Sequence, residues 1–283
     1  MGAPTLIDFD RLEEDLDARA EAYRAAEPFP HAVLDGVLTA SAFHEAASEF
    51  PAIGDEFWKG FLHVNQTKYS NTEPDTWGPT LHAVARELCG PRFVSYLERL
   101  TGIEGLKSDW SMDGGGLHQT LRGGYLNIHA DFTTHHTHKH WARRVNILLY
   151  LNEAEWQEQW GGLLELWDSD MTEVKARVTP AGNRMLVFST GEDTFHGHPE
   201  GLTCPPDVAR RSLALYYFTE EAEVRRRATN YRPRPGESTT RRAAIAADRK
   251  VLDVYDRVKR RLGVSDDKVN ALLTRIDRLR PRK

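Results

Sequence analysis

The sequence has few cysteines and no long apolar run. Its two cysteines, Cys89 and Cys204, exclude the disulfide framework of a small secreted protein. The start, Met1 to Asp8, lacks a basic and apolar export signal, and Leu6 breaks the myristoylation pattern. Apolar runs stay far shorter than a membrane span requires. These features favour a reduced, soluble protein of the cytoplasm, with no membrane contact.

Charge is distributed unevenly along the 283 residues. The net charge is -5, yet residues 223–283 hold 19 Lys and Arg against 8 Asp and Glu, which leaves 18 against 34 for residues 1–222. The simplest explanation is a basic tail that packs on, or lies in solvent beside, an acidic body. A bolder hypothesis is that the tail recruits an acidic carrier protein. No nucleic-acid partner is expected, because the basic residues alternate with helix-spaced apolar residues and not with exposed aromatics.

Apolar spacing predicts helices before residue 110. Residues 9–23 read as one amphipathic helix, and residues 29–35 as an extended segment. Residues 41–49 have helical character, with Ser41 as the candidate N-cap. Residues 79–102 read as two helices, interrupted at Gly90 and Pro91. We expect these helices to support a sheet.

From residue 110 onward, short strands alternate with Gly, Pro and Asn or Asp turns, which indicates a sandwich or jelly roll. We predict a support region over residues 1–109, a jelly-roll core over 110–222, a linker over 223–238 and basic helices over 239–283. The apolar faces of those last helices need a partner, which is either the body of this chain or a second subunit in a homodimer.

The triplet His129-Ala130-Asp131 carries the strongest chemical signal. Such a triplet occurs about once by chance in a chain of this composition, so its context decides. Alternation over residues 125–131 predicts a strand with one face that carries Tyr125, Asn127, His129 and Asp131. Two imidazoles and one carboxylate can bind one face of a ferrous ion and leave the other open for a cosubstrate and dioxygen. The alternative is an ordinary half-buried strand with its polar side chains in water.

The second imidazole of such a site would come from His196 or His198. We favour His196, because Gly197 lets the backbone turn beside a metal and Pro199 disfavours a regular ladder near His198. We therefore expect His198 to be a loop histidine.

A cation lies in the strand predicted at residues 210–218. Arg210 and Ser212 share one face of this strand, while Arg211 lies on the other. A guanidinium inside a barrel is costly unless it is paired, and the same strand offers no nearby acidic partner. A ligand carboxylate would satisfy it through two hydrogen bonds. An acidic side chain from elsewhere in the chain is the alternative.

These features resemble the iron(II)- and 2-oxoglutarate-dependent oxygenases and, within them, the bacterial relatives of the prolyl 4-hydroxylase catalytic domain. The likeness covers about residues 114–218. It rests on six blocks in the same order: GGGLHQ at 114–119, GGYLNIHAD at 123–131, NILLYLN at 146–152, WGGLLELW at 160–167, and the segments around His196 and Arg210.

The resemblance implies an α+β fold whose core is a double-stranded β-helix (jelly roll, cupin-like), with N-terminal supporting helices and a C-terminal helical extension. It implies Fe(2+) ligands at His129, Asp131 and His196. It implies a 2-oxoglutarate site at Arg210, Tyr150 and Ser212, with O2 as cosubstrate. Residues near the substrate or around the ligands would be Tyr125, Asn127, Gln119 and Trp167.

The resemblance predicts a dioxygenase that hydroxylates, or otherwise oxidises, an unactivated C–H bond of an amino acid, a peptide or a natural-product substrate, with release of succinate and CO2. In the related halogenases a small residue replaces the carboxylate, so Asp131 favours hydroxylation or another two-electron oxidation. The alternative is a non-catalytic cupin-like protein that binds a metal or a small acid. A zinc hydrolase fits less well, because the motif contains no Glu base.

Four histidines follow the triplet: His135, His136, His138 and His140. Such a cluster on a loop is usually a solvated, adventitious metal binder rather than a second dedicated site. Its place beside the proposed iron suggests a lid on the substrate side.

Overall fold

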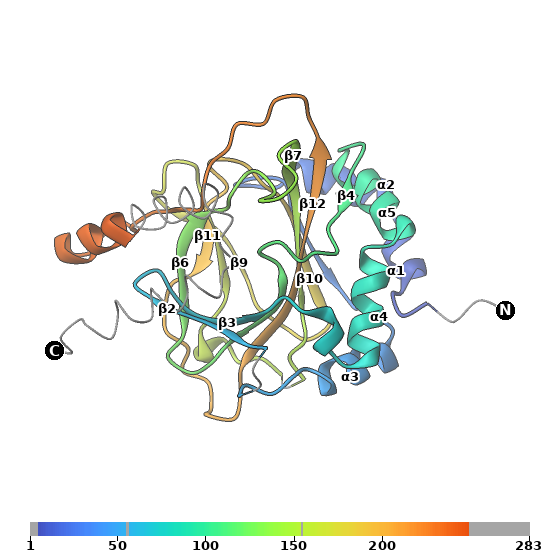
Figure 1. The fold of residues 1–283 in the computed structure, drawn as a ribbon, viewed down its shortest axis with the longest axis horizontal. Coiled ribbons are helices and arrows are strands. Elements are labelled where there is room, and N and C mark those ends of the chain that lie inside the picture. The colour runs from blue at the N-terminus through green and yellow to red at the C-terminus, as the bar shows by residue number, and fades with distance from the viewer. Residues whose placement is uncertain (1–4, 55–56, 154, 249–283) are drawn as a thin grey trace.

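A computed structural model describes residues 5–54, 57–153 and 155–248 of the chain (Figure 1). The helices are α1 (Phe9–Glu13), α2 (Leu16–Ala25), α3 (Ala40–Ser48), α4 (Pro79–Leu88), α5 (Pro91–Thr101) and the short 3-10 helices η1 (Pro74–Thr76) and η2 (Glu158–Trp160). The strands are β1 (His31–Asp35), β2 (Lys59–His63), β3 (Gln66–Asn71), β4 (Lys107–Ser108), β5 (Gly116–Thr120), β6 (Tyr125–Ala130), β7 (Trp141–Tyr150), β8 (Leu164–Trp167), β9 (Val174–Val178), β10 (Arg184–Ser189), β11 (His196–His198), β12 (Arg210–Glu220) and β13 (Asn230–Tyr231).

The strands form one 13-stranded antiparallel sheet in the order β1-β10-β7-β12-β5-β3-β6-β11-β8-β9, with β13 beside β6, β2 beside β3 and β4 beside β12. Strand β3 pairs with β5 through residues 69–71 and with β6 through residues 66–67. The sheet therefore turns a corner at β3 and folds back on itself. This nearly closed barrel confirms the predicted double-stranded β-helix, or jelly roll, with its supporting helices.

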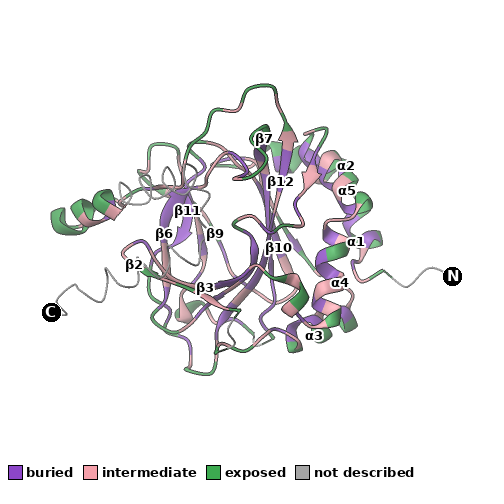
Figure 2. Ribbon diagram, in the orientation of Figure 1, coloured by how far each residue is buried: buried purple, intermediate pink, exposed green. Residues whose placement is uncertain are grey.

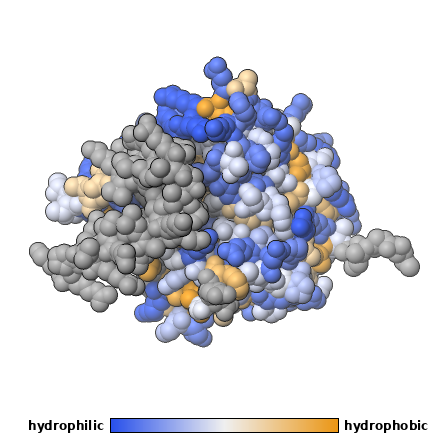
Figure 3. All heavy atoms as spheres, in the orientation of Figure 1, coloured by the Kyte–Doolittle hydropathy of each residue, from blue (hydrophilic) through white to orange (hydrophobic). Residues whose placement is uncertain are grey.

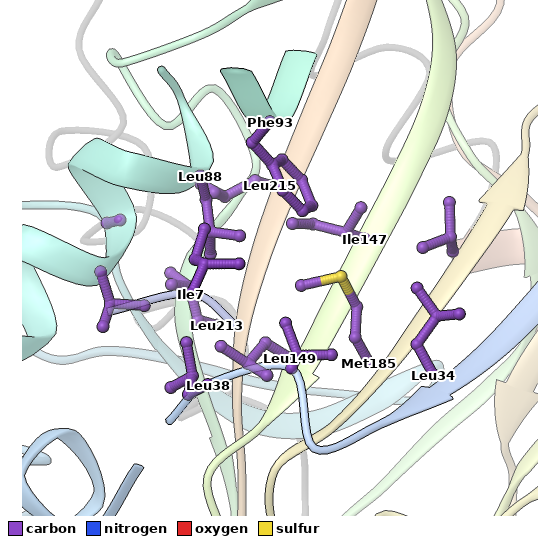
Figure 4. Close-up of a cluster of buried hydrophobic side chains, with 14 of the residues drawn as sticks. Ile7, Leu34, Leu38, Leu88, Phe93, Ile147, Leu149, Met185, Leu213 and Leu215 are labelled. Atoms are coloured by element: carbon purple, nitrogen blue, oxygen red, sulfur yellow. The ribbon is translucent and has the colours of Figure 1, made fainter. Parts of the chain in front are cut away.

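One face of the sheet is covered by the N-terminal helices (Figure 1). In the core between them, Leu88 and Phe93 of α4 and α5 meet Ile147 and Leu149 of β7 and Leu213 of β12 (Figure 4). Each of these side chains is fully buried, and each stabilises the fold by about 1.5–3 kcal/mol. The central strands are accordingly buried along most of their length (Figure 2). The helices thus cover the outer face of the sheet, and the polar side chains described below lie on its inner face.

A second cluster fills part of the barrel interior. Leu164 and Leu166 of β8 pack against Leu186 and Phe188 of β10, and Tyr150 of β7 joins them. Side chains of the two sheet halves thus meet across the barrel, as expected for sheets about 10 Å apart. This apolar floor lies beside the polar side chains described below.

The helices agree with the predictions except in detail. Residues 9–23 form two helices rather than one, because the chain breaks at Asp15, which takes a left-handed conformation (φ 52°). Helix α3 is capped by Thr39, which accepts from the backbone of Ala42, and not by Ser41. The two helices predicted in residues 79–102 are α4 and α5, and Pro91 occupies the first turn of α5 as the sequence suggests.

Strands from outside residues 110–222 also enter the sheet. Strands β1, β2, β3 and β4 come from the predicted support region, and β13 comes from the predicted linker. Residues 239–248 are helical, with Ile245 buried, while the remainder of the two predicted C-terminal helices lies outside the described residues. No helix in the described part of the chain has the length and apolarity of a membrane span.

Basic residues that follow β12 make ion pairs with the acidic body. Arg227 pairs with Glu192 at 2.5 Å, and Arg234 pairs with Glu200 at 2.6 Å. These contacts support the simpler explanation of the charge asymmetry, a tail that packs on its own body. A carrier protein or a homodimer at this segment stays a prediction. On the face in Figure 3, hydrophilic residues predominate and apolar residues occur in small groups.

Candidate active site

The barrel brings His129, Asp131 and His196 together. His129 of β6 lies opposite His196 of β11 in the ladder, and Asp131 follows directly after β6. The Nε2 atom of His129 lies 3.5 Å from Asp131 Oδ1, and that of His196 lies 3.5 Å from Asp131 Oδ2. Among the described residues, these three are the one group of His, Cys, Asp or Glu with three ligand atoms within 4.8 Å of one another. All three come from the predicted set.

Close approach of β11 to β6 requires a glycine between the two histidines of β11. A Cβ atom on Gly197 would lie 2.7 Å from the carbonyl oxygen of Leu126 and 2.8 Å from that of Asn127. Real Cβ atoms essentially never come so close to backbone. The glycine thus allows the contact that places His196 against His129.

Backbone carbonyls fix the orientation of both imidazoles. His129 Nδ1 lies 2.9 Å from the carbonyl oxygen of Asn127, and His196 Nδ1 lies 3.0 Å from that of Thr194. In each case Nδ1 donates the proton, so the Nε2 lone pair faces Asp131. Burial lowers the pKa of His196 to about 4, although Asp131 acts in the opposite direction. The imidazole is therefore neutral near pH 7, as a metal ligand must be.

Two polar side chains of β7 hold one oxygen of Asp131. Asp131 Oδ2 accepts from Arg143 Nη2 at 3.0 Å and from Asn146 Nδ2 at 2.7 Å. Arg143 Nε in turn donates to Asn146 Oδ1 at 2.7 Å, and the guanidinium stacks on Tyr216, 3.3 Å from the ring centroid. Burial alone would raise the pKa of Asp131, but Arg143 and the two histidines hold it well below its usual range. Asp131 is thus a fixed carboxylate with Oδ1 left for a metal.

Arg210 is also buried inside the barrel, 5% exposed. Its Nε donates to the carbonyl oxygen of Gly162 at 2.8 Å and its Nη2 donates to the hydroxyl of Tyr150 at 3.1 Å. Ser212 lies opposite Tyr150 in the ladder, on the same face as Arg210. Within the described residues no carboxylate pairs with Arg210, and burial lowers its pKa. The acidic partner considered above as an alternative is therefore not found there.

Arg211, the neighbouring arginine, lies on the other face of β12 and not in the barrel interior. It pairs with Gln119 of β5 in the ladder, and its guanidinium lies 5.3 Å from the Phe50 ring centroid. Gln119 shares this outer face and points away from the three ligands. The structure therefore separates Arg210 from both residues.

Tyr125 and Asn127 also lie away from the ligands, because β6 has one extra residue between the positions that pair with His198 and His196. The hydroxyl of Tyr125 and the side-chain amide of Asn127 both donate to the carbonyl oxygen of Val64, at 3.2 and 3.1 Å. Asn127 does act on the site, but through its backbone carbonyl.

Trp167 packs behind the site rather than in it. It contacts Ile128, Ala130 and Phe195, which alternate with the ligand residues and face the other side of their strands. Its Nε1 donates to Glu165 at 3.0 Å. Trp167 thus supports the strands that carry the ligands, from the side of those strands opposite the ligands.

His198 is a buried strand residue, 3% exposed, and the prediction of a loop histidine is wrong. It lies outside the group of three ligand side chains, but its pKa is held well below the usual value by burial and by the charges of Arg210 and Lys68. His118 of β5 and Lys68 of β3 are two further residues of this interior that the sequence analysis missed. His118 lies opposite Ser212 in the ladder.

The histidine loop is anchored by His135 and His136, while His138 and His140 are exposed. His135 is 2% exposed, and its Nε2 lies 3.3 Å from Asp109 Oδ2, while His136 Nδ1 lies 2.7 Å from Asp113 Oδ1. His138 stacks on Trp141. The expectation of a solvated cluster is thus wrong for His135. A lid role stays a prediction.

The comparisons with known proteins agree with this geometry. Residues 115–218 match the model of the 2OG-Fe(II) oxygenase superfamily. A prolyl hydroxylase from Trichoplax adhaerens, solved with a peptide fragment of the hypoxia inducible factor oxygen degradation domain, is 15% identical with a TM-score of 0.55, over 74% of this chain and 91% of that chain. A prolyl-4-hydroxylase from Pseudomonas putida is 18% identical with a TM-score of 0.51, over 72% of this chain and 99% of that chain. A search of the curated proteins gives no match.

The two structural neighbours share the fold, and the family model adds the chemistry. This agreement confirms the prediction of an enzyme over that of a non-catalytic binding protein, and it confirms iron and 2-oxoglutarate as the cofactors. The match to the 2OG-Fe(II) oxygenase superfamily thus lies over residues 115–218, and the protein is a 2-oxoglutarate-dependent dioxygenase.

Proposed function

We propose that His129, Asp131 and His196 bind the ferrous ion and that the enzyme hydroxylates an unactivated C–H bond of an amino acid, a peptide or a natural product. The donor set fits this ion, because two imidazoles and one carboxylate suit a ferrous centre with open positions. The 3.5 Å separations in this structure are close to those of ligands about 2.1 Å from one ion. Backbone carbonyls and Arg143 already hold the three side chains in the required orientation.

Arg210 is the residue that we assign to the distal carboxylate of 2-oxoglutarate. It is a buried cation beside the Tyr150 hydroxyl and Ser212, and a carboxylate would supply its missing counter-charge. Gly162 helps to fix its direction, since the Gly162 carbonyl accepts from Nε and a Cβ on Gly162 would lie 3.2 Å from Arg210 Cδ. A dianion held between Arg210 and the three ligands would bridge the two halves of the site.

When bound, the ferrous ion supplies the oxidation in which one O2, one 2-oxoglutarate and one C–H bond give succinate, CO2 and a C–OH group. The side chains of this protein supply geometry and a dry pocket. Phe188 packs against His196 with ring centroids 4.8 Å apart, and Tyr231 packs against His129 at 5.3 Å. These rings limit access of water to the two imidazoles, which suppresses side reactions of the oxidant.

The observation that carries this proposal is the combination of a three-ligand group with a buried arginine that has no carboxylate partner among the residues that the structure describes. The two structural neighbours are prolyl hydroxylases, and one of them was solved with a peptide. These names support tests with amino acids and proline-containing peptides, without making proline the substrate.

The test is succinate release from 2-oxoglutarate with Fe(II), O2 and a panel of free amino acids and proline peptides. We expect release that depends on one member of the panel and that His129→Ala and Asp131→Ala both abolish. His44→Ala is a matched control, because His44 lies in α3 on the opposite side of the sheet. Turnover that survives both ligand substitutions would contradict the metal assignment.

A further inference from the structure

One cation of the interior is not used by the proposed function. Lys68 lies on β3 and is partly buried. Within the described residues its ammonium group has no hydrogen bond or ion pair. A partly buried ammonium group that has no partner among the described residues is costly, so it indicates a ligand.

The strand register places Lys68 inside the barrel. Ser70 of β3, His118 of β5, Ser212 of β12 and Tyr150 of β7 lie opposite one another in one row across four strands. Lys68 is two residues from Ser70 and therefore shares this inner face. Extension of the β3–β5 register by one residue puts Lys68 opposite Thr120, which is also opposite Arg210. The backbones of Lys68 and Arg210 are then about 10 Å apart, which is two strand spacings.

The pKa of Lys68 responds to charges from both the metal-ligand group and the proposed 2-oxoglutarate site. Burial lowers the pKa of Lys68 to about 8, Asp131 acts against this shift, and Arg210 and Arg143 add to it. Of these residues, Asp131 belongs to the metal-ligand group and Arg210 to the proposed 2-oxoglutarate site. Lys68 remains mostly charged at pH 7.

The charge balance of the loaded site favours an anion on the substrate. A ferrous ion and the 2-oxoglutarate dianion cancel each other, and Arg143 cancels Asp131. Arg210 and Lys68 then leave an excess of two positive charges in a low-dielectric interior. Such an excess is costly unless a further anion enters. The distal carboxylate of 2-oxoglutarate is already assigned to Arg210 and its other end to the metal, so the further anion belongs to the primary substrate.

We propose that Lys68 binds a carboxylate of the primary substrate and thereby selects substrates that carry a negative charge near the oxidised carbon. This inference rests on the proposed function, since it assumes that Arg210 and the metal hold 2-oxoglutarate. An ammonium group forms charge-assisted hydrogen bonds with a carboxylate, and removal of such a bond weakens binding by about tenfold or more. A neutral amide of the same shape would not gain this interaction.

The experiment uses Mn(II) in place of Fe(II), saturating 2-oxoglutarate, and acetate as the probe. Bound Mn(II) enhances the relaxation of acetate methyl protons when acetate enters the site. We expect this enhancement in the wild-type protein and in Lys68→Arg, at least a tenfold weaker apparent affinity in Lys68→Met, and no enhancement for acetamide. Lys107→Met is the control, because Lys107 pairs with Glu220 on β4 and β12, away from the interior.

A separate arm measures 2-oxoglutarate affinity by calorimetry on the Mn(II) protein. We expect Lys68→Met to change this affinity by less than threefold. A tenfold loss would assign the carboxylate to the cosubstrate and overturn the inference, as would acetate relaxation that is absent in the wild type or unchanged in Lys68→Met. A wild-type protein that binds no 2-oxoglutarate would instead contradict the proposed function itself.

Discussion

Substitution of Arg210 by Met should separate cosubstrate binding from folding. Hydrogen bonds to a charged group contribute about 1.5–3 kcal/mol each, so loss of the pairing with a carboxylate should cost about 3 kcal/mol. This corresponds to a 2-oxoglutarate affinity about 100-fold weaker, since 1.4 kcal/mol is a factor of ten. Calorimetry on the Mn(II) protein measures this change directly.

The cofactor-free protein should tolerate the same substitution. Arg210 there is a buried cation with two neutral acceptors, the Gly162 carbonyl and the Tyr150 hydroxyl. Met retains the apolar stem, and removal of the buried charge offsets the two lost hydrogen bonds. We expect the free energy of unfolding without cofactor to change by about 1 kcal/mol or less.

Ligand-induced stability gives a second readout of the same variant. At a 2-oxoglutarate concentration 100 times the wild-type Kd, binding should stabilise the wild-type protein by about 2.7 kcal/mol and Arg210→Met by about 0.4 kcal/mol. Arg211→Met is the matched control, because Arg211 lies on the outer face of β12. Wild-type affinity in Arg210→Met, or equal losses in both variants, would refute the assignment.

Three further predictions follow from individual contacts. Gly197→Ala forces a Cβ within 2.8 Å of two backbone carbonyl oxygens, so it should lower the free energy of unfolding by about 2 kcal/mol and weaken metal binding. Urea unfolding measures the first effect and metal titration the second. Unchanged values of both would contradict the close approach of β11 to β6. Burial holds the pKa of His118 well below 6.5, so the folded metal-free protein binds fewer protons than the unfolded chain. The free energy of unfolding should therefore decrease as the pH falls below 6.5, by about 1.4 kcal/mol per pH unit. Urea unfolding of His118→Gln should show a smaller dependence on pH. The same dependence in His118→Gln and in the wild type would contradict this prediction. His135→Ala should destabilise the fold by about 2 kcal/mol, because it removes a buried imidazole that contacts Asp109 and accepts from the backbone N–H groups of Thr137 and His138, while 2-oxoglutarate affinity stays unchanged; calorimetric weakening of that affinity would favour a role in the site.

The ligand residues could be predicted from the sequence because their signals are local. A strand alternates with period two, so the pairs His129 with Asp131 and Arg210 with Ser212 each fall on one face. The same rule failed for Tyr125 and Asn127, because the extra residue in β6 arises from pairing with a strand some 70 residues away. A bulge of this kind leaves no mark in the composition of one strand.

Other parts of the site depend on contacts between distant segments. Lys68 enters the barrel only because β3 pairs with β5 and β6, which lie about 50 residues further along the chain. The sequence predicts a loop at His198 because Pro199 cannot donate to a ladder, but β11 ends at His198, so the missing N–H of Pro199 falls outside the strand. Proline in this case marks the end of a strand and does not exclude the residue before it from that strand.

Anaerobic titration of Fe(II) tests the central assignment most directly. We predict that one ferrous ion binds per wild-type chain, that Asp131→Ala and His196→Ala each lose this ion, and that His198→Gln retains it. Retention of the ion in His196→Ala together with its loss in His198→Gln would contradict the account.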